Sequence, residues 1–327
     1  MKKALLTLSF LASIAVPTGT LLAQESAYPS KPINYIIPFP PGGPTDVAGR
    51  VMGEALGKVL GQSVVVENKS GASGSIGMTQ LIRSPADGYT IAALGAPSLT
   101  APFILESAPY NLSTDIKPIG IAYITPLVIV TNPKKTPEIK DMASLVTFTQ
   151  KHAQGINYTS SSIGSTGHLS MELLRKDLGL TMTHIPYRGS APALSALMAG
   201  DVTLMYSDLV AVLQHIKAGA LTPLAVNTDA RLDELPDTPT LKELNMQGSK
   251  AVSWGGIVAP KNTPDAVVQK LEQSLAQILK DPEVLKKMKS VGAYPFYQNA
   301  KAAEKIIADD SQTWAKVIKD NQIKPQN

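Results

Sequence analysis

The alternation of short apolar runs with amphipathic stretches is the feature that most limits the fold of this chain. "NYIIPF", residues 34–39, is apolar and short enough for a buried strand. Residues 44–60 present one apolar helical face, because an apolar residue recurs every four positions at Val47, Val51, Ala55 and Val59. The same order returns several times along the chain. It predicts βαβ units, a largely parallel sheet and therefore an α/β fold.

Two long apolar segments have the character of crossings between lobes. "IGIAYITPLVIVTN", residues 119–132, is too long for an edge strand and is divided by Pro126. "VSWGGIVAPKNTP", residues 252–264, is the second such segment. The chain would build part of one lobe, then all of another, and then return. We expect a first lobe from 24–122 and 250–327, and a second lobe from 123–249.

The N-terminus has the order of a secretory signal peptide. Lys2 and Lys3 precede "ALLTLSFLASIAVPTGTLLA", a short apolar core that ends in small residues. The alternative is a buried N-terminal helix, but Pro17 and Gly19 interrupt the apolar run early. We expect residues 1–23 to be removed near Ala23 and the mature protein to be exported to the periplasm.

Composition excludes several classes of function. The chain has no cysteine, which excludes disulfides, thiol catalysis and thiolate metal sites. The formal net charge of +4 is spread without a basic block, so nucleic acid is not an expected partner. The sequence contains no G-x-S-x-G, H-E-x-x-H or G-x-G-x-x-G signature and no local metal motif. We therefore expect no catalytic residue, no metal and no cofactor.

The stretch "IIPFPPGGPTDVAGR", residues 36–50, passes from an expected strand to an expected helix through a turn whose prolines make it stiff and whose glycines have no side chains. Gly42 and Gly43 leave backbone N–H groups open, and Thr45 adds a hydroxyl at the positive end of the helix dipole. A carboxylate is the expected guest, although an ordinary helix entry is the alternative. Asp46 is interpreted as a helix cap or as an acceptor for N–H groups of the loop.

Two further turns have the same anion-binding chemistry. "TSSSIGSTGHLSMELL", residues 159–174, crowds hydroxyls at a glycine-opened helix start, whereas a Ser/Thr cap alone would need only one of them. His168 is interpreted as a structural hydrogen-bonding group. Gly189-Ser190 opens another helix, and the preceding Arg188 pairs either with an anion or in a surface salt bridge. Three such turns without a reactive constellation favour binding over catalysis.

The order of several motifs resembles one family across essentially the whole mature chain. These motifs are "YPSKPINYIIPFPPGGPTDVAGR", "VENKSGASGSIG", "PADGYT", "GSTGHLSMELL", "IPYRGSAPALSALMAGDV", "IKAGALTPLAV", "PTLKEL" and "GGIVAPKNTP". They are similar to the Bug-type solute receptors of tripartite tricarboxylate transporters. The resemblance implies a two-lobe, type II-like periplasmic binding protein with its ligand cleft between lobes joined by crossing strands.

The resemblance also implies where a ligand would bind. It places one carboxylate at the Pro41–Asp46 turn, often through ordered waters, with "LGAPSLT" at the pocket floor or side. The turn 162–166, the loop 187–190 and the end of "VTLMYSD" would supply the other wall. The expected ligand-binding residues are Phe39, Pro41, Gly42, Gly43, Thr45, Asp46, Ser98, Ser162, Ser165, Thr166, Tyr187, Gly189, Ser190, Ser207 and Asp208.

One departure from the family pattern bears on the choice of ligand. Where the family has an aspartate in a "MFDN"-like run, this chain has "MYSD", with Ser207 at that place and the carboxylate moved to Asp208. A buried ammonium without a carboxylate is costly, and a serine can donate to a second carboxylate. We expect a dicarboxylate, aromatic like terephthalate or short and aliphatic, although an inward Asp208 would restore the missing charge.

Three functions remain open from the sequence. The first is a transport receptor, expected to act as a monomer, that delivers a small organic acid to membrane transporter subunits. The second is a sensor subunit that presents its closed form to a signalling partner. The third is a periplasmic hydrolase or lyase that uses Ser165 and His168.

Overall fold

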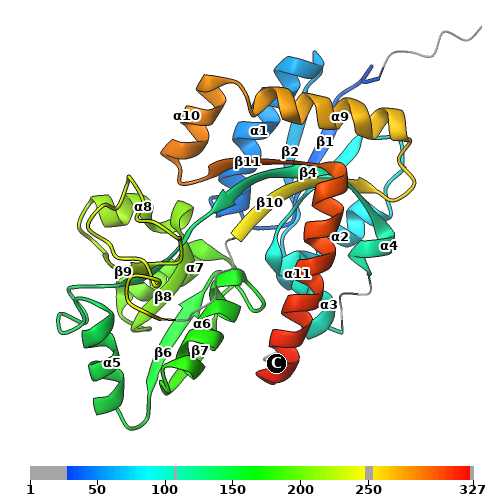
Figure 1. Ribbon diagram of the computed structural model, residues 1–327. Coiled ribbons are helices and arrows are strands. Elements are labelled where there is room, and N and C mark those ends of the chain that lie inside the picture. The colour runs from blue at the N-terminus through cyan, green and yellow to red at the C-terminus, as the bar shows by residue number, and fades with distance from the viewer. Residues whose placement is uncertain (1–27, 107, 109, 247–252, 325–327) are drawn as a thin grey trace, which may run out of the picture.

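The computed structural model describes residues 28–106, 108, 110–246 and 253–324. The predicted signal peptide lies outside these residues. Two mixed α/β sheets form the frame, and Figure 1 shows them in separate lobes, with the long helix α11 running down one side of the first. We call the lobe around the larger sheet the first lobe and the other the second lobe.

The first lobe contains a six-stranded sheet. Its strand order is β11 (Tyr294–Asn299), β4 (Ile116–Thr125), β10 (Ser253–Pro260), β3 (Thr90–Leu94), β1 (Ile33–Ile37) and β2 (Val64–Asn68). One face packs on α1 (Pro44–Leu60), α9 (Asp265–Ile278) and α10 (Pro282–Ser290). The other packs on α2 (Ser75–Ile82), α3 (Ala96–Ile104) and α11 (Ala300–Asp320). The short η1 (Ala72–Gly74) and α4 (Leu112–Asp115) lie in connections.

The second lobe contains a five-stranded sheet. Its order is β7 (Met182–Pro186), β6 (Ile156–Ser160), β8 (Leu204–Asp208), β5 (Leu127–Thr131) and β9 (Thr222–Val226). Side chains of α5 (Met142–Lys151) and α6 (Thr166–Asp177) share a core on one face. Those of α7 (Ser190–Ala199) and α8 (Leu209–Lys217) share a core on the other. Each sheet is therefore buried between helices, as the α/β pattern predicts.

The expectation of a largely parallel sheet is wrong. Among the strands of the described residues, parallel pairing occurs in β2–β1–β3 and β7–β6–β8. The strands β10 and β4 pair antiparallel with their neighbours, and β5 runs antiparallel to both β8 and β9. The reason is the connectivity, because the segments that cross between the lobes enter each sheet against the direction of its βαβ strands.

Pro126 separates the two halves of the first crossing. β4 ends at Thr125 in the first sheet and β5 begins at Leu127 in the second. The return crossing is β10, which pairs with β4 over its whole length. Residues 247–252, where the second lobe was predicted to end, lie outside the described part, and the exact lobe boundaries stay a prediction.

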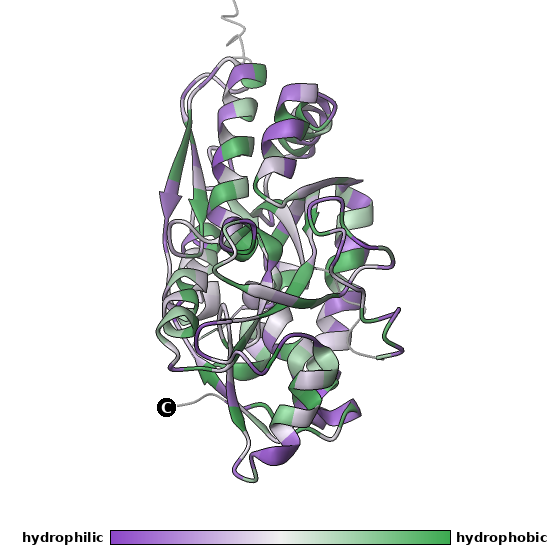
Figure 2. Cartoon of the chain, turned by 90° about the vertical axis from the view of Figure 1, so that its left-hand side faces the viewer, coloured by the Kyte–Doolittle hydropathy of each residue, from purple (hydrophilic) through white to green (hydrophobic). Residues whose placement is uncertain are grey.

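Local sequence signals account for the helix boundaries. Pro44 occupies the first turn of α1, where its missing N–H costs nothing, and Gly61 follows in the left-handed conformation with φ of 67°. Asp141, Ser165 and Asn299 cap α5, α6 and α11 with side-chain oxygens. In Figure 2 the outer helices alternate between hydrophilic and hydrophobic colours, as amphipathic helices that cover a sheet do.

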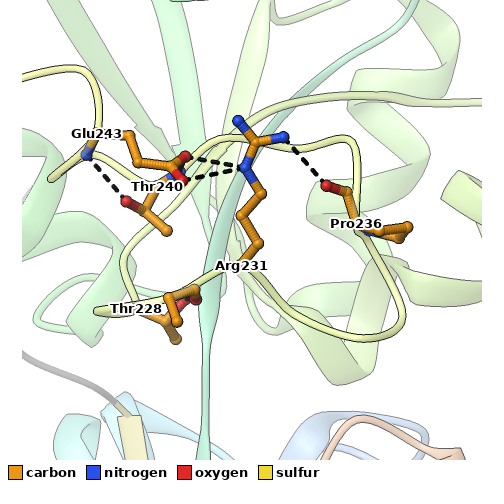
Figure 3. Close-up of polar contacts among 6 residues, drawn as sticks. Thr228, Arg231, Pro236, Thr240 and Glu243 are labelled. Atoms are coloured by element: carbon orange, nitrogen blue, oxygen red, sulfur yellow. Dashed lines mark hydrogen bonds and ion pairs between the residues drawn. The ribbon is translucent and has the colours of Figure 1, made fainter.

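The loop after β9 is fastened by one side chain. Arg231 Nε donates to both carboxylate oxygens of Glu243, at 3.1 and 3.0 Å, and its Nη1 donates to Pro236 O at 3.1 Å (Figure 3). Glu243 in turn accepts from the backbone N–H of Thr240 at 2.9 Å. These contacts fix the proline-rich stretch on the outside of the second lobe.

Candidate functional site

A cavity of about 740 Å³ lies between the lobes. The first lobe lines it with residues of the 38–45 turn, the 70–76 segment and 95–97. The second lobe contributes residues within 161–166, residues 186–191 and Asp208. Crossing strands close one side, with Tyr123 and Thr125 of β4 and Ser253 and Trp254 of β10. Its size suits a small organic ligand.

Six α-helices begin at this cavity. Their N-cap residues all belong to its lining, and they are Gly43 of α1, Gly74 of α2, Gly95 of α3, Ser165 of α6, Gly189 of α7 and Asp208 of α8. The first backbone N–H groups of a helix lack intrahelical acceptors, and the helix dipole is positive at that end. The four glycine caps carry no side chain that competes for these N–H groups. The cavity is therefore surrounded by anion-attracting backbone.

The turn before α1 is locked by a side chain beneath it. Asp46 accepts from Gly42 N at 2.9 Å and from Asn68 Nδ2 at 2.8 Å, and it pairs with Arg50. Burial acts to raise the pKa of this carboxyl, but the hydrogen bonds from Arg50, Gly42 and Asn68 lower it below its usual value. The interpretation of Asp46 as an acceptor for loop N–H groups is confirmed, and its negative charge is paired with Arg50 of α1.

Two stacked histidines support the serine-rich turn. Ser165 Oγ accepts from the backbone N–H of His168 at 3.2 Å and donates to Ser160 Oγ at 3.1 Å, which lies 2.9 Å from His184 Nε2. The rings of His168 and His184 stack at 3.9 Å, and His168 Nδ1 accepts from Gly164 N–H. Burial lowers the pKa of His168 to about 4, so the ring is neutral near pH ~7. The His168 ring thus bonds to the backbone of the turn at Gly164, and the hydrogen bond of the Ser165 hydroxyl is to the His168 backbone and not to the ring.

Four buried oxygen atoms of the cavity lining have no hydrogen-bond partner among the described residues. They are Thr125 Oγ1, Ser162 Oγ, Ser190 Oγ and Asp208 Oδ1. Native proteins rarely leave buried polar atoms unsatisfied without a ligand or water to complete them. Three of the four are hydroxyls, which can donate to an anion.

Asp208 is the acidic residue in this lining, and Arg188 is the basic one. Burial raises the pKa of Asp208 to about 6, although a hydrogen bond from Ser253 acts in the opposite direction. Tyr123 faces both lobes: its hydroxyl bonds with Thr45, and the charge of Asp208 contributes to its raised pKa after the larger effect of burial. A polar row of hydroxyls and one carboxyl thus runs along the crossing strands.

Most of the residues expected at the site meet at the cavity. Those in the lining are Phe39, Pro41, Gly43, Thr45, Ser162, Ser165, Thr166, Tyr187, Gly189, Ser190 and Asp208. Gly42 and Asp46 lie in the same turn without lining the cavity, and Ser98 is fully buried behind it. Ser207 is also buried, and its Oγ donates to Asp208 O at 3.1 Å. Asp208 therefore lines the cavity, which is the alternative left open above, and the expectation that Ser207 lines it is wrong.

The 70–76 segment and the crossing strands also line the cavity, and neither was among the expected ligand-binding segments. Gly71, Ser73 and Gly74 belong to the quoted motif "VENKSGASGSIG", so a glycine signal was present there. Tyr123, Thr125 and Trp254 stand in apolar strand patterns and carry no such signal. Their place in the site depends on which strands cross between the lobes.

The two lobes touch each other beside the cavity. Thr100 Oγ1 of α3 donates to Gly164 O at 2.8 Å, and Ser73 Oγ donates to Ile163 O at 3.2 Å. A Cβ atom at Gly189 would lie 3.0 Å from Pro40 Cγ, so these turns also meet closely. The structure is thus a closed arrangement in which both lobes enclose the cavity.

Comparison with known proteins identifies the family. The family model described as tripartite tricarboxylate transporter family receptor matches residues 48–323. This chain belongs to that receptor family. It is 34% identical to Protein BugT of Bordetella pertussis over 311 residues, which cover 94% of this chain and 95% of the relative.

Solved structures agree with the family assignment. The periplasmic binding protein BugD is 35% identical, with a TM-score of 0.84 over 91% of this chain and 100% of its own. An R. palustris protein solved with adipate is 31% identical, with a TM-score of 0.86 over 91% of this chain and 100% of its own. The resemblance drawn from the motifs and the two-lobe binding-protein fold are confirmed. Within the described residues of this receptor, no helix has the length and apolar character needed to span a bilayer.

Proposed function

We propose that this receptor captures a small dicarboxylate in the periplasm and delivers it to a tripartite tricarboxylate-type membrane transporter. The observation that carries the proposal is the convergence of six helix starts and three buried hydroxyls without a described protein partner on one cavity between the lobes. Backbone N–H groups at helix starts and hydroxyl donors are what carboxylate oxygens require.

Binding and closure are coupled in this proposal. One ligand carboxylate binds at the turn 41–45, directly or through water, while the second-lobe turns at 162–166 and 187–190 hold the rest of the ligand. The ligand touches both lobes only when they are closed, so it selects the closed state. The segments 119–132 and 250–260 serve as the hinge; residues 250–252 of the second segment lie outside the described part.

The remaining elements of the proposal concern partners and chemistry. The chain acts as a monomeric receptor and not as an enzyme, with the signal peptide removed on export. An R. palustris relative was solved with adipate, which supports an aliphatic diacid as a first ligand class to test, beside aromatic diacids such as terephthalate. The hydrolase alternative lacks support from the site, because the His168 ring accepts from Gly164 N–H and stacks on His184.

The proposal is tested by a thermal-shift screen of aliphatic and aromatic carboxylic acids, followed by calorimetric titration of those that stabilise. A ligand that binds only the folded protein raises its melting temperature by mass action. Solution scattering with and without the best acid then reports closure as a smaller radius of gyration. A screen in which no acid stabilises the protein contradicts the proposed binding function. A radius of gyration that is unchanged at saturating ligand contradicts the closure of the two lobes.

A further inference from the structure

The carboxyl of Asp208 occupies an unusual position for a receptor of anions, because the residue is partly exposed while one of its oxygens is buried. It lines the cavity, its Oδ1 atom is buried, and that atom has no hydrogen-bond partner among the described residues. Gly43, Gly95 and Gly189 begin three neighbouring helices whose positive ends face the same space. An ionised Asp208 would repel a ligand carboxylate placed beside it, unless one proton is shared between the two.

The groups around Asp208 are hydroxyls and apolar side chains. Tyr123 faces it from β4, and the Ser253 hydroxyl donates to it from β10. From β5 its cross-strand neighbour is Leu127, and the first residue of α8 is Leu209. Arg188 is the basic residue elsewhere in the described lining. Tyr123 is thus the titratable group that faces Asp208, and its raised pKa keeps it neutral over the working range of pH.

This environment suits a carboxyl–carboxylate pair better than an ammonium group. An ammonium carries three donors and needs several acceptors, whereas Thr45, Tyr123 and Ser253 offer hydroxyls that also donate to a carboxylate. The positive helix ends favour negative charge in the same space. A carboxyl whose pKa is raised to about 6 takes up a proton readily near neutral pH.

We propose that Asp208 recognises the second carboxylate of a diacid in its protonated form, so that each diacid bound takes one proton from solvent into the cleft. The proton forms an O–H bond on one carboxyl oxygen of the pair and a hydrogen bond to the other. This inference rests on the carboxylate-receptor function proposed above. It makes Asp208 the residue that distinguishes diacids from monoacids and from amino acids.

Three probes of equal chain length separate the possibilities: adipate, hexanoate and 6-aminohexanoate. They share one carboxylate and differ at the far end, which is a carboxylate, a methyl group or an ammonium group. Calorimetric titration of the wild-type protein between pH ~6 and ~8.5, in two buffers of different ionisation enthalpy, measures both affinity and proton uptake. We expect adipate to bind about tenfold more weakly for each pH unit above the pKa of Asp208, with about one proton taken up at the top of the range.

The other two probes should behave differently. Hexanoate should show no pH dependence, and 6-aminohexanoate should bind more weakly than adipate near pH ~6. Asp208→Asn imitates the protonated carboxyl, so its adipate affinity should not change with pH and should exceed that of the wild type about tenfold or more at pH ~8. Asp201→Asn makes the same substitution at an exposed site of the second lobe and should titrate like the wild type.

Three outcomes decide the matter. Adipate binding without proton uptake, or with an affinity that is constant over the range, overturns the inference and leaves the proposed function intact. Tightest binding of 6-aminohexanoate, increasing with pH, overturns it in favour of a cation partner for Asp208. Absence of binding for all three acids at every pH removes the proposed function and the inference together. The proton count needs no variant, so it stands even if Asp208→Asn folds poorly.

Discussion

The two walls of the cavity hold anionic ligands by different means. The first-lobe wall is built on the turn 38–45, whose backbone is set by prolines and glycines and locked from below by Asp46, with the Thr45 hydroxyl beside it. The second-lobe wall presents side chains, including Ser162, Ser190 and Asp208. The first wall is supported by the Asp46–Arg50 ion pair. The second wall is supported by a buried network without net charge, made by Ser160, His168 and His184.

This difference teaches how affinity and selectivity are divided between the walls. Backbone N–H groups offer the same donors to any carboxylate, so the first wall supplies a general anion site. Hydroxyls and a protonatable carboxyl discriminate between ligand ends, so the second wall sets the choice of ligand. If this division holds, substitutions in the first wall should weaken all acids equally, and substitutions in the second should change their ranking.

The largest effect is expected from a substitution that keeps the walls apart. Gly164 has φ of +72°, and an added Cβ atom would collide with Thr100 Oγ1 and lie 2.8 Å from Ile104 Cδ1 in the other lobe. Gly164→Val should therefore prevent closure and weaken the binding of every acid by about 100-fold or more. Separately, the left-handed backbone should cost the folded protein about 1–2 kcal/mol of stability. Calorimetric titration measures the loss of affinity, and solution scattering measures the loss of closure.

Gly179→Val is the matched control for that substitution. Gly179 lies at the other end of α6 with φ of +63°, and an added Cβ atom has nothing within 4 Å. It should reduce stability by a similar backbone penalty and leave acid binding unchanged. Equal binding losses in both variants would mean that strain, and not blocked closure, is responsible.

The buried histidines should make the second lobe labile to acid. Burial lowers the pKa of His168 to about 4 and that of His184 to about 2, with the charge of His168 adding to the effect at His184. Between pH ~6.5 and ~4 the unfolded chain takes up protons on these rings and the folded protein does not, so stability falls as the pH falls. His168 alone would contribute about 3 kcal/mol, at about 1.4 kcal/mol for each pKa unit.

Asp208 opposes that trend. Its folded pKa is raised to about 6, so its contribution to stability is complete below the unfolded pKa of ~3.9 and is lost as the pH rises through about 6. Denaturant titrations across this range should show a steeper loss towards acid in Asp208→Asn than in the wild type. Stability that stays constant down to pH ~4 would contradict the assignment of neutral buried rings.

Sequence patterns predicted the elements with strong punctuation. The helix expected over 44–60 is α1 (Pro44–Leu60), because Pro44 and Gly61 mark both ends. The helices α3 and α10 were not predicted; α3 contains Pro97 and Pro102, which interrupt a helical pattern. The edge strand β11 was not predicted either, because Pro295 interrupts its strand pattern. In the structure its pairing with β4 is irregular after Pro295.

The site was predictable where glycine and serine turns follow strands, as at Gly43, Ser165 and Gly189. It was not predictable where one residue of register decides the face, because neighbouring strand residues point to opposite sides. Ser207 and Asp208 show this at the end of β8. Contacts such as that between Thr100 and Gly164 join residues 64 positions apart and depend on lobe closure, which no local pattern encodes.

A smaller loss of binding is expected from filling the first wall. Gly43 has φ of −77°, which any residue adopts, and an added Cβ atom would lie 3.4 Å from Pro40 O. Gly43→Val should keep the fold and weaken adipate, hexanoate and terephthalate alike by about tenfold or more, through loss of roughly 1.4 kcal/mol or more of binding free energy. Gly43→Ala should show a smaller loss. An altered ranking of the acids would mean that this wall also selects the ligand.

Removing single hydroxyls from the second wall should have a still smaller effect. Ser162 Oγ and Ser190 Oγ are buried without a partner among the described residues, so their removal costs no hydrogen bond within that part of the protein. Ser162→Ala and Ser190→Ala should each weaken diacids by about 1 kcal/mol, roughly fivefold, and leave the melting temperature equal or higher. Ser195→Ala removes an exposed hydroxyl that donates to Ala191 O and should leave binding unchanged. A fall in stability without loss of binding would assign both serines a structural role.

The smallest effect is expected in the second lobe away from the cavity. The Arg231–Glu243 pair in Figure 3 is about half exposed, and neither residue lines the cavity. Exposed ion pairs contribute little, so Arg231→Ala should lower the free energy of unfolding by about 0.5–1 kcal/mol, through its contacts with Glu243 and Pro236 O. Glu243→Ala should cost somewhat more, because the carboxylate also accepts from Thr240 N. Neither variant should change the affinity for adipate or its dependence on pH in calorimetric titration. A change in the adipate affinity or in its pH dependence would show that selectivity is distributed through the whole second lobe. It would contradict the assignment of selectivity to the side chains that line the cavity.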